Sequence, residues 1–154
     1  MSKFKAFFVK HKDRMKALGV KLNPPATNED ISKLEIAVGN ILPEEIRSFY
    51  AYCNGFDTDD WIFNLLSIEQ ILYYKSELEL SEFYFAEYMI YSDDWRVKIE
   101  DTETYFITNG NHKEEQEVVL TNSIFEFLEI YLNSDGVLSE NGLYRWFEEK
   151  NSSR

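Results

Sequence analysis

The sequence has few of the residues that build disulfides, metal sites and phosphate-binding loops. Its single cysteine, Cys53, excludes an internal disulfide and fits a reducing compartment. The two histidines, His11 and His112, lie far apart and match no catalytic triad or metal-ligand spacing. The apolar stretches are too short for a transmembrane helix or a signal-peptide core. We therefore expect a cytoplasmic protein that has no membrane span, no catalytic residues, no metal and no cofactor.

Three aspartates, Asp57, Asp59 and Asp60, stand close together as they do at the start of a calcium loop. A calcium loop that began at Asp57 would place Ile62 where glycine is required and Ile68 where a bidentate glutamate is required. We therefore do not expect the three aspartates to bind calcium.

What the chain does contain is enough apolar material for one domain. It has 154 residues, of which 44% are hydrophobic, and its aromatic residues comprise 12 Phe, 10 Tyr and 3 Trp. A chain of this length buries roughly 68–70% of the surface that its unfolded form exposes. We expect residues 1–154 to form a single domain whose core needs no metal or disulfide.

The chain is strongly acidic, and its charged residues are unevenly distributed. The net charge is −12, yet residues 1–22 carry seven basic side chains against one acidic, a net of +6. Residues 77–117 carry twelve acidic side chains against three basic, a net of −9. Such a surface repels the phosphate backbone of nucleic acids and favours a basic partner. The alternative is that the acidic residues serve only solubility.

The N-terminal segment predicts a basic amphipathic helix over residues 2–18. Phe4, Phe7, Phe8 and Met15 recur at helical spacing, lysines occupy the other faces, and Gly19 ends the pattern. Such a helix can lie on an anionic membrane or dock on the acidic body of the same chain. We favour docking on the body and expect no membrane binding.

Helix-start signals recur along the rest of the chain. Capping boxes are predicted at Thr27 with Asp30, at Ser67 with Gln70 and at Ser123 with Glu126, and Pro43 marks a further start. A last helix is expected around residues 141–150. Around Pro43 the apolar residues are predicted to be core rather than site: Leu42, Ile46, Phe49 and Cys53. Cys53 is therefore expected to be a buried hydrophobe instead of a nucleophile.

The middle of the chain has the period of strands. Residues 83–92, 95–99, 105–108 and 118–121 are predicted strands, and residues 92–94 and 109–111 are predicted turns. The strands follow one another too closely for crossover helices, so they should pair mainly antiparallel. The predicted fold class is α+β, with a largely antiparallel central sheet flanked by N- and C-terminal helices.

One segment resembles a known family signature. Ile41-Leu42-Pro43, then Ile46, Phe49 and Tyr50, then Asn54-Gly55-Phe56 resemble the SUKH superfamily, the domain first described in fungal cell-wall assembly regulators. The helix from Thr27 and the segments 66–71 and 123–128 fall in the family's order. The resemblance covers Thr27 to Leu132.

The resemblance implies a function as well as a fold. It implies an α+β domain without a catalytic motif that is, in bacteria, usually an immunity protein binding and neutralising a polymorphic toxin, often a nuclease. The expected partner is a basic toxin domain. Two alternatives remain: an intracellular adaptor or regulatory module of the same fold with a different partner, and an unrecognised hydrolase.

Two acidic segments that each adjoin a tryptophan are the candidate partner-binding sites. Both are expected to be irregular loops, and tryptophan is enriched at interface hot spots. The alternative is that they are acidic turns beside core tryptophans. The candidate residues are Asp57, Asp59, Asp60 and Trp61 in the first segment and Asp93, Asp94 and Trp95 in the second.

Overall fold

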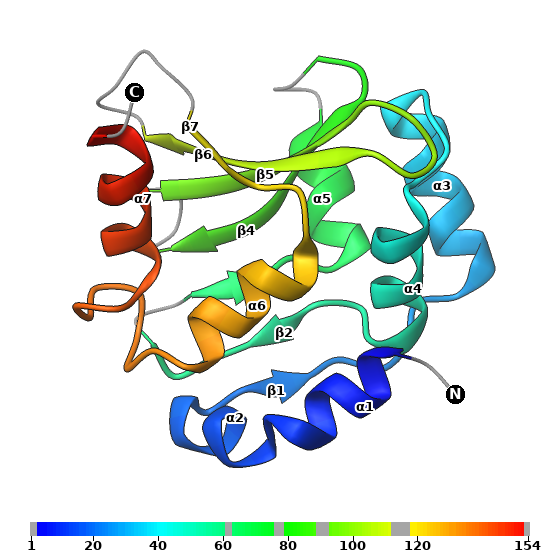
Figure 1. Cartoon of the computed structure of the whole chain (residues 1–154). Coiled ribbons are helices and arrows are strands. Elements are labelled where there is room, and N and C mark those ends of the chain that lie inside the picture. The colour runs from blue at the N-terminus through cyan, green and yellow to red at the C-terminus, as the bar shows by residue number, and fades with distance from the viewer. Residues whose placement is uncertain (1–2, 61–62, 76–78, 89–92, 112–117, 153–154) are drawn as a thin grey trace.

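A seven-stranded antiparallel sheet organises the part of the chain that the structure describes (Figure 1). The computed structural model describes residues 3–60, 63–75, 79–88, 93–111 and 118–152. Each strand pairs with the next in sequence, so the spatial order follows the chain. The strands are β1 (Lys21–Leu22), β2 (Phe56–Asp57), β3 (Asn64–Leu65), β4 (Glu82–Tyr88), β5 (Asp93–Ile99), β6 (Tyr105–Asn111) and β7 (Val118–Thr121).

Helices precede, interrupt and follow the sheet. They are α1 (Lys3–Lys10), α2 (Lys12–Leu18), α3 (Asn28–Val38), α4 (Glu44–Tyr52), α5 (Ile68–Tyr74), α6 (Ile124–Leu132) and α7 (Leu143–Ser152). Figure 1 shows α6 crossing one face of the sheet and α7 running along the side where β4 ends and β5 begins. The predicted α+β class with an antiparallel sheet and flanking helices is confirmed.

The core lies between α6 and the strands β4 and β5. Phe127 of α6 makes edge contacts with Phe85 of β4 at 5.3 Å and with Trp95 of β5 at 6.1 Å between ring centroids. All three side chains are fully buried. Along β5 the side chains alternate, so Trp95, Val97 and Ile99 share the α6 face while the charged residues between them face the other way.

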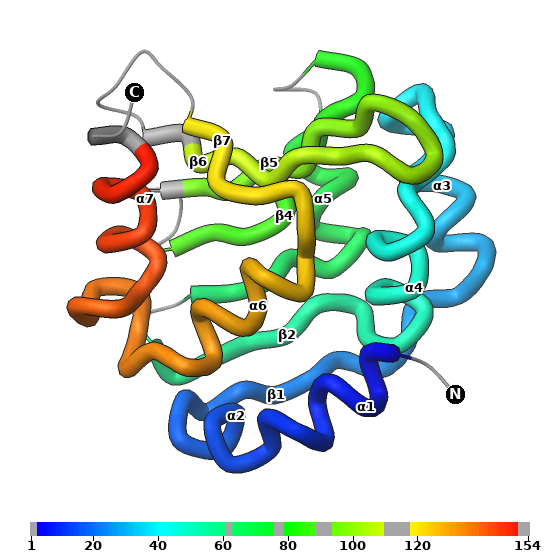
Figure 2. Tube along the Cα trace, in the orientation of Figure 1, coloured from blue at the N-terminus to red at the C-terminus, as the bar shows by residue number. Residues whose placement is uncertain are grey.

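The N-terminal segment docks on this core, as the sequence predicted. Phe4 is buried and stacks on Phe125 of α6 with a centroid distance of 4.3 Å. Phe8 is also buried and stacks on Tyr52 of α4 at 5.5 Å. Figure 2 shows the two N-terminal helices lying along the edge of the molecule where β1 runs.

The expected single helix over residues 2–18 is divided in two at His11. The His11 backbone leaves the helical region, and its Nδ1 lies 2.9 Å from the Phe7 carbonyl oxygen. The change of helix direction at His11 brings Arg14 of α2 to the end of α6, where Arg14 Nε donates to the Leu132 carbonyl at 2.9 Å. A cation at a helix C-terminus is favourable because the carbonyl ends carry partial negative charge.

Two of the three predicted capping boxes are present. Thr27 Oγ1 accepts from the Asp30 amide at 3.0 Å while Asp30 Oδ2 accepts from the Thr27 amide, and Ser67 with Gln70 forms the same reciprocal pair. At the third, Ser123 Oγ accepts from the Glu126 amide at 3.3 Å, but the Ser123 amide donates to Thr121 Oγ1 instead of to Glu126, so the box is incomplete. The helix after Pro43 begins at Glu44, one residue later than a proline at the first helical position would place it.

The strand predictions need three corrections. Residues 92–94 were expected to be a turn, but β5 already begins at Asp93 and pairs there with Tyr88. The turn expected at residues 109–111 is wrong, because β6 continues to Asn111. The two-residue strands β1, β2 and β3 were not predicted, since two residues are too few to show a period.

The prediction that α4 contributes core residues can be tested by a substitution that leaves a cavity. Phe49 is fully buried and makes an edge contact with Phe4 at 5.5 Å. Phe49→Ala should lower the free energy of unfolding by about 3–5 kcal/mol, because the surroundings cannot fill the space of the lost ring. Urea unfolding measures this loss. Ile36→Ala is the control, because Ile36 is 80% exposed on α3 and should change stability by no more than about 0.5 kcal/mol. Equal effects would contradict the core assignment.

Candidate functional site

The first acidic segment places two aspartates at the surface. Asp57 is exposed on β2, where its backbone pairs with Lys21 of β1. Asp59 is exposed too, and its amide donates to the Leu18 carbonyl at 3.1 Å. Its carboxylate packs over Gly19, which has a φ of +69° and leaves no space there for a side chain. Both side chains are therefore exposed at the surface, where a partner can reach them.

Asp60 has a structural role instead. Its Oδ2 accepts from the Val137 amide at 2.7 Å and from the Tyr131 hydroxyl at 3.4 Å. These bonds tie the β2–β3 connection to the segment after α6. Burial, with a contribution from the charge of Asp60, raises the pKa of Tyr131. Trp61, the fourth candidate in this segment, lies outside the described residues.

The second acidic segment is not an exposed loop, and the prediction that it is one is wrong. Asp94 has a side chain only 2% exposed and forms an ion pair with Arg96 Nε at 3.1 Å. Trp95 is fully buried and makes an edge contact with Phe63 at 5.5 Å. Strand alternation explains this, because β5 includes Asp93 to Trp95 and turns the indole toward α6. The side chain of Asp93 lies outside the described residues.

A row of polar residues crosses the sheet on the face away from the indole. Strand register makes cross-strand neighbours of Asp57, Asn64, Glu87 and Asp94, on β2 to β5 in turn. Burial raises the pKa of Glu87, and a hydrogen bond from Asn64 opposes this shift. Within the described part of the chain, Glu87 Oε2 is buried without a hydrogen-bond partner. The sequence did not single out Glu87, because one carboxylate in an aromatic-rich strand carries no distinct signal.

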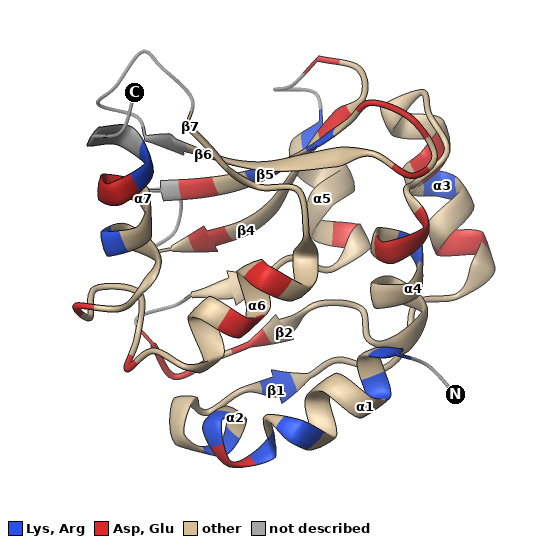
Figure 3. Ribbon diagram, in the orientation of Figure 1, with Lys and Arg blue, Asp and Glu red and all other residues tan. Residues whose placement is uncertain are grey.

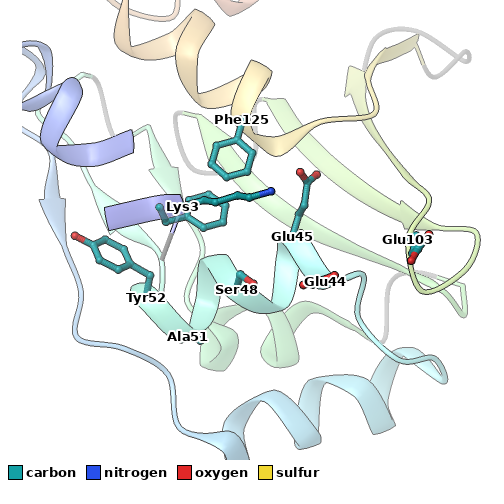
Figure 4. A pocket seen from close by; sticks show the side chains of 9 residues that line it. Lys3, Glu44, Glu45, Ser48, Ala51, Tyr52, Glu103 and Phe125 are labelled. Atoms are coloured by element: carbon teal, nitrogen blue, oxygen red, sulfur yellow. The ribbon is translucent and has the colours of Figure 1, made fainter. Parts of the chain in front are cut away.

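A groove with a volume of about 640 Å³ lies between α1, α4 and α6 (Figure 4). Apolar rings and carboxylates share its lining. It is lined by Lys3, Phe4, Glu44, Glu45, Ser48, Ala51, Tyr52, Glu103 and Phe125. Sequence reasoning missed this groove, because Glu44 and Glu45 are already explained as favourable first-turn residues of a helix.

One carboxylate of the groove is held in a fixed position. Glu45 Oε1 accepts from the Tyr105 hydroxyl at 2.6 Å, and the Tyr105 oxygen accepts from the Ile124 amide at 2.7 Å. Burial and the bond to Glu45 both raise the pKa of Tyr105. The phenol therefore stays protonated and keeps donating to Glu45 at neutral pH.

Charge segregates over the molecule (Figure 3). Lysines and arginines gather on α1, α2 and β1, whereas acidic residues occur on α4, α6 and the β5–β6 turn. Among the described residues, no group of three or more histidine, cysteine, aspartate or glutamate side chains is arranged to hold a metal ion. In the same part of the chain, no helix combines the length and apolarity needed to cross a membrane.

The architecture defines an α+β domain in which helices cover an antiparallel meander, and comparison with protein families agrees. The model of the SMI1 / KNR4 family (SUKH-1) matches residues 25–134, which is more than half of the chain. The chain therefore belongs to this family, as its resemblance over Thr27 to Leu132 indicated. A search of curated proteins found no match.

Cys53 provides a test of the buried helix face beside the groove. The thiol is buried, and burial raises its pKa to about 12. At about pH 8 only about one thiol in ten thousand is then ionised, and the thiolate is the reactive form. Iodoacetamide should label the native protein very slowly and the guanidinium-unfolded protein rapidly, as mass spectrometry would record. Rapid labelling of the native chain would instead reveal an accessible nucleophile.

Proposed function

We propose that this protein is a noncatalytic, cytoplasmic immunity protein that binds a cognate basic toxin domain, such as a nuclease, and neutralises it stoichiometrically. The observation that carries the proposal is membership of the SMI1 / KNR4 family (SUKH-1), because SUKH domains are protein-interaction modules. No cofactor, metal, membrane or nucleic acid takes part in this function.

The charge distribution supports a basic partner. The net charge is −12, and the basic residues near the N-terminus lie together on α1, α2 and β1 (Figure 3). The remaining surface is therefore more acidic than the total suggests. An enzyme that cleaves nucleic acid needs a cationic cleft, and an acidic inhibitor is attracted to such a cleft over distances of about 10 Å at 0.1 M salt.

Inhibition by a stoichiometric complex is the direct test. We expect a gene beside this one to encode the toxin domain, and the chain should co-purify with that domain and abolish its activity at a one-to-one ratio. Size-exclusion chromatography and a toxin activity assay measure the two results. Absence of a complex with the neighbouring toxin would refute the immunity role, and capture of a different, non-toxin partner would favour the adaptor alternative.

The exposed aspartates of the first segment should steer this association. Asp57→Asn with Asp59→Asn removes two surface charges, and we expect association to slow by roughly two- to tenfold at low ionic strength with a shallower salt dependence. Stopped-flow measurements at several salt concentrations give both quantities. Asp60 and Asp94 are left unchanged because their carboxylates have partners within the fold.

A matched control separates local steering from total charge. Glu29→Gln with Glu69→Gln removes the same number of charges from exposed positions on α3 and α5. This control should slow association less than the aspartate pair does. Equal slowing by the two double variants would mean that only net charge matters, and the first acidic segment would then not be part of the binding surface.

A further inference from the structure

The groove between α1, α4 and α6 has an apolar floor. Phe4 and Phe125 stack at a centroid distance of 4.3 Å, and Tyr52 stacks on Phe8 at one end. Phe125 and Tyr52 remain partly exposed although each offers a ring surface. The volume of about 640 Å³ lies within the roughly 300–1,000 Å³ typical of binding sites, so the groove can accept more than one side chain.

The rim of the groove is acidic. Glu44, Glu45 and Glu103 line it with one cation, Lys3, which leaves a net charge of −2 from three carboxylates and one ammonium. Glu44 and Glu103 are exposed, whereas Glu45 is partly buried and fixed by the Tyr105 hydroxyl at 2.6 Å. A carboxylate that is already oriented loses little entropy when it binds a cation.

The groove already accommodates a cationic side chain. Lys3 is one of the lining residues, and Figure 4 shows its ammonium end directed toward Glu45. In the described part of the chain Lys3 forms no salt bridge, so this position is filled without a close ion pair. An arginine or lysine that approached from outside would find the same apolar support for its stem and the same carboxylate for its charge.

We propose that this groove binds a basic segment of a partner protein. One arginine or lysine of that segment pairs with Glu45 and displaces Lys3, and a neighbouring apolar side chain packs on the partly exposed rings of Phe125 and Tyr52. The inference rests on the proposed function in one respect, because that function makes the ligand of the groove a protein. The acidic rim repels the phosphates of nucleic acid and of lipid headgroups, and this charge complementarity commits the site to a basic peptide.

The groove is separate from the acidic segment at Asp57 and Asp59. It lies at the start of α1 and along α4, whereas Asp59 packs against Gly19 at the end of α2. The two regions therefore make independent contributions: the aspartates steer a distant partner, while the groove holds one of its side chains. Variants in one region should leave the effect of the other unchanged.

The test selects peptides without using a toxin. Phage-displayed random dodecapeptides are selected on the immobilised full chain, and we expect enrichment of sequences that place Arg or Lys beside a leucine or an aromatic residue. A peptide with an enriched sequence is then synthesised, and its affinity for the full chain is measured by fluorescence anisotropy. Enrichment of no sequence, or of acidic sequences, would overturn the proposal.

Two groove variants locate the binding site. Ser48→Arg fills the groove from an exposed position of α4, and Glu45→Gln removes the charge while keeping an acceptor for Tyr105. Each should weaken peptide binding by roughly tenfold or more. Circular dichroism and thermal melting establish whether each variant folds. If Ser48→Arg does not fold, Glu45→Gln still tests the proposal.

Matched controls carry the same chemical changes elsewhere. Ser32→Arg lies on the exposed face of α3 and Glu69→Gln on the exposed face of α5. Both should bind the peptide as the parent chain does. Equal weakening by the groove variants and their controls would overturn the proposal. A failed immunity role gives a different result, because it removes the toxin complex without affecting peptide binding to the groove.

Discussion

The contact between α6 and the sheet, made by Phe127 with Phe85 and Trp95, holds the other elements in place. Aromatic contacts extend from it in both directions, and each ring fixes the element that carries it. On one side they run from Phe85 to Phe49 of α4 and on to Phe4 and Phe8 of α1. On the other side they run from Trp95 to Phe63, in the connection between β2 and β3, and on to Tyr131 of α6. Because α1 is part of this continuous packing, its basic face is displayed at a fixed place on the molecule rather than on a loose extension.

Charge is arranged around this apolar interior in two kinds of position. Some acidic residues are bound within the fold, as Asp60 is to Val137 and Asp94 is to Arg96. Others, including Asp57 and Asp59, remain exposed. Only the second kind lies where a partner can reach it, so the sequence cluster of three aspartates overstates the surface available for binding. The groove beside Glu45 adds an acidic site that sequence clustering did not indicate.

Sequence predicted the elements whose signals are local. Thr27 with Asp30 and Ser67 with Gln70 mark helix starts through bonds between near neighbours, and period-two patterning located β4 to β7. It assigned Asp93 and Asp94 to a turn because two aspartates before a strand fit a turn as well as the first residues of the strand. It also offered Trp95 as a partner-binding residue, although strand alternation buries the indole. The groove could not be predicted, because its walls come from α1, α4 and α6 and depend on tertiary packing alone.

The bonds of Arg14 to Leu132 and Ser134 join residues separated by 118 and 120 positions in sequence. Synthesis at roughly 5–20 residues per second separates the appearance of these partners by about 6–24 s. During that interval the nascent N-terminal segment exposes Phe4 without Phe125 of α6 to cover it. The segment can meet α4 earlier through Phe49 and Tyr52, but its docking is expected to be complete only after translation has passed α6.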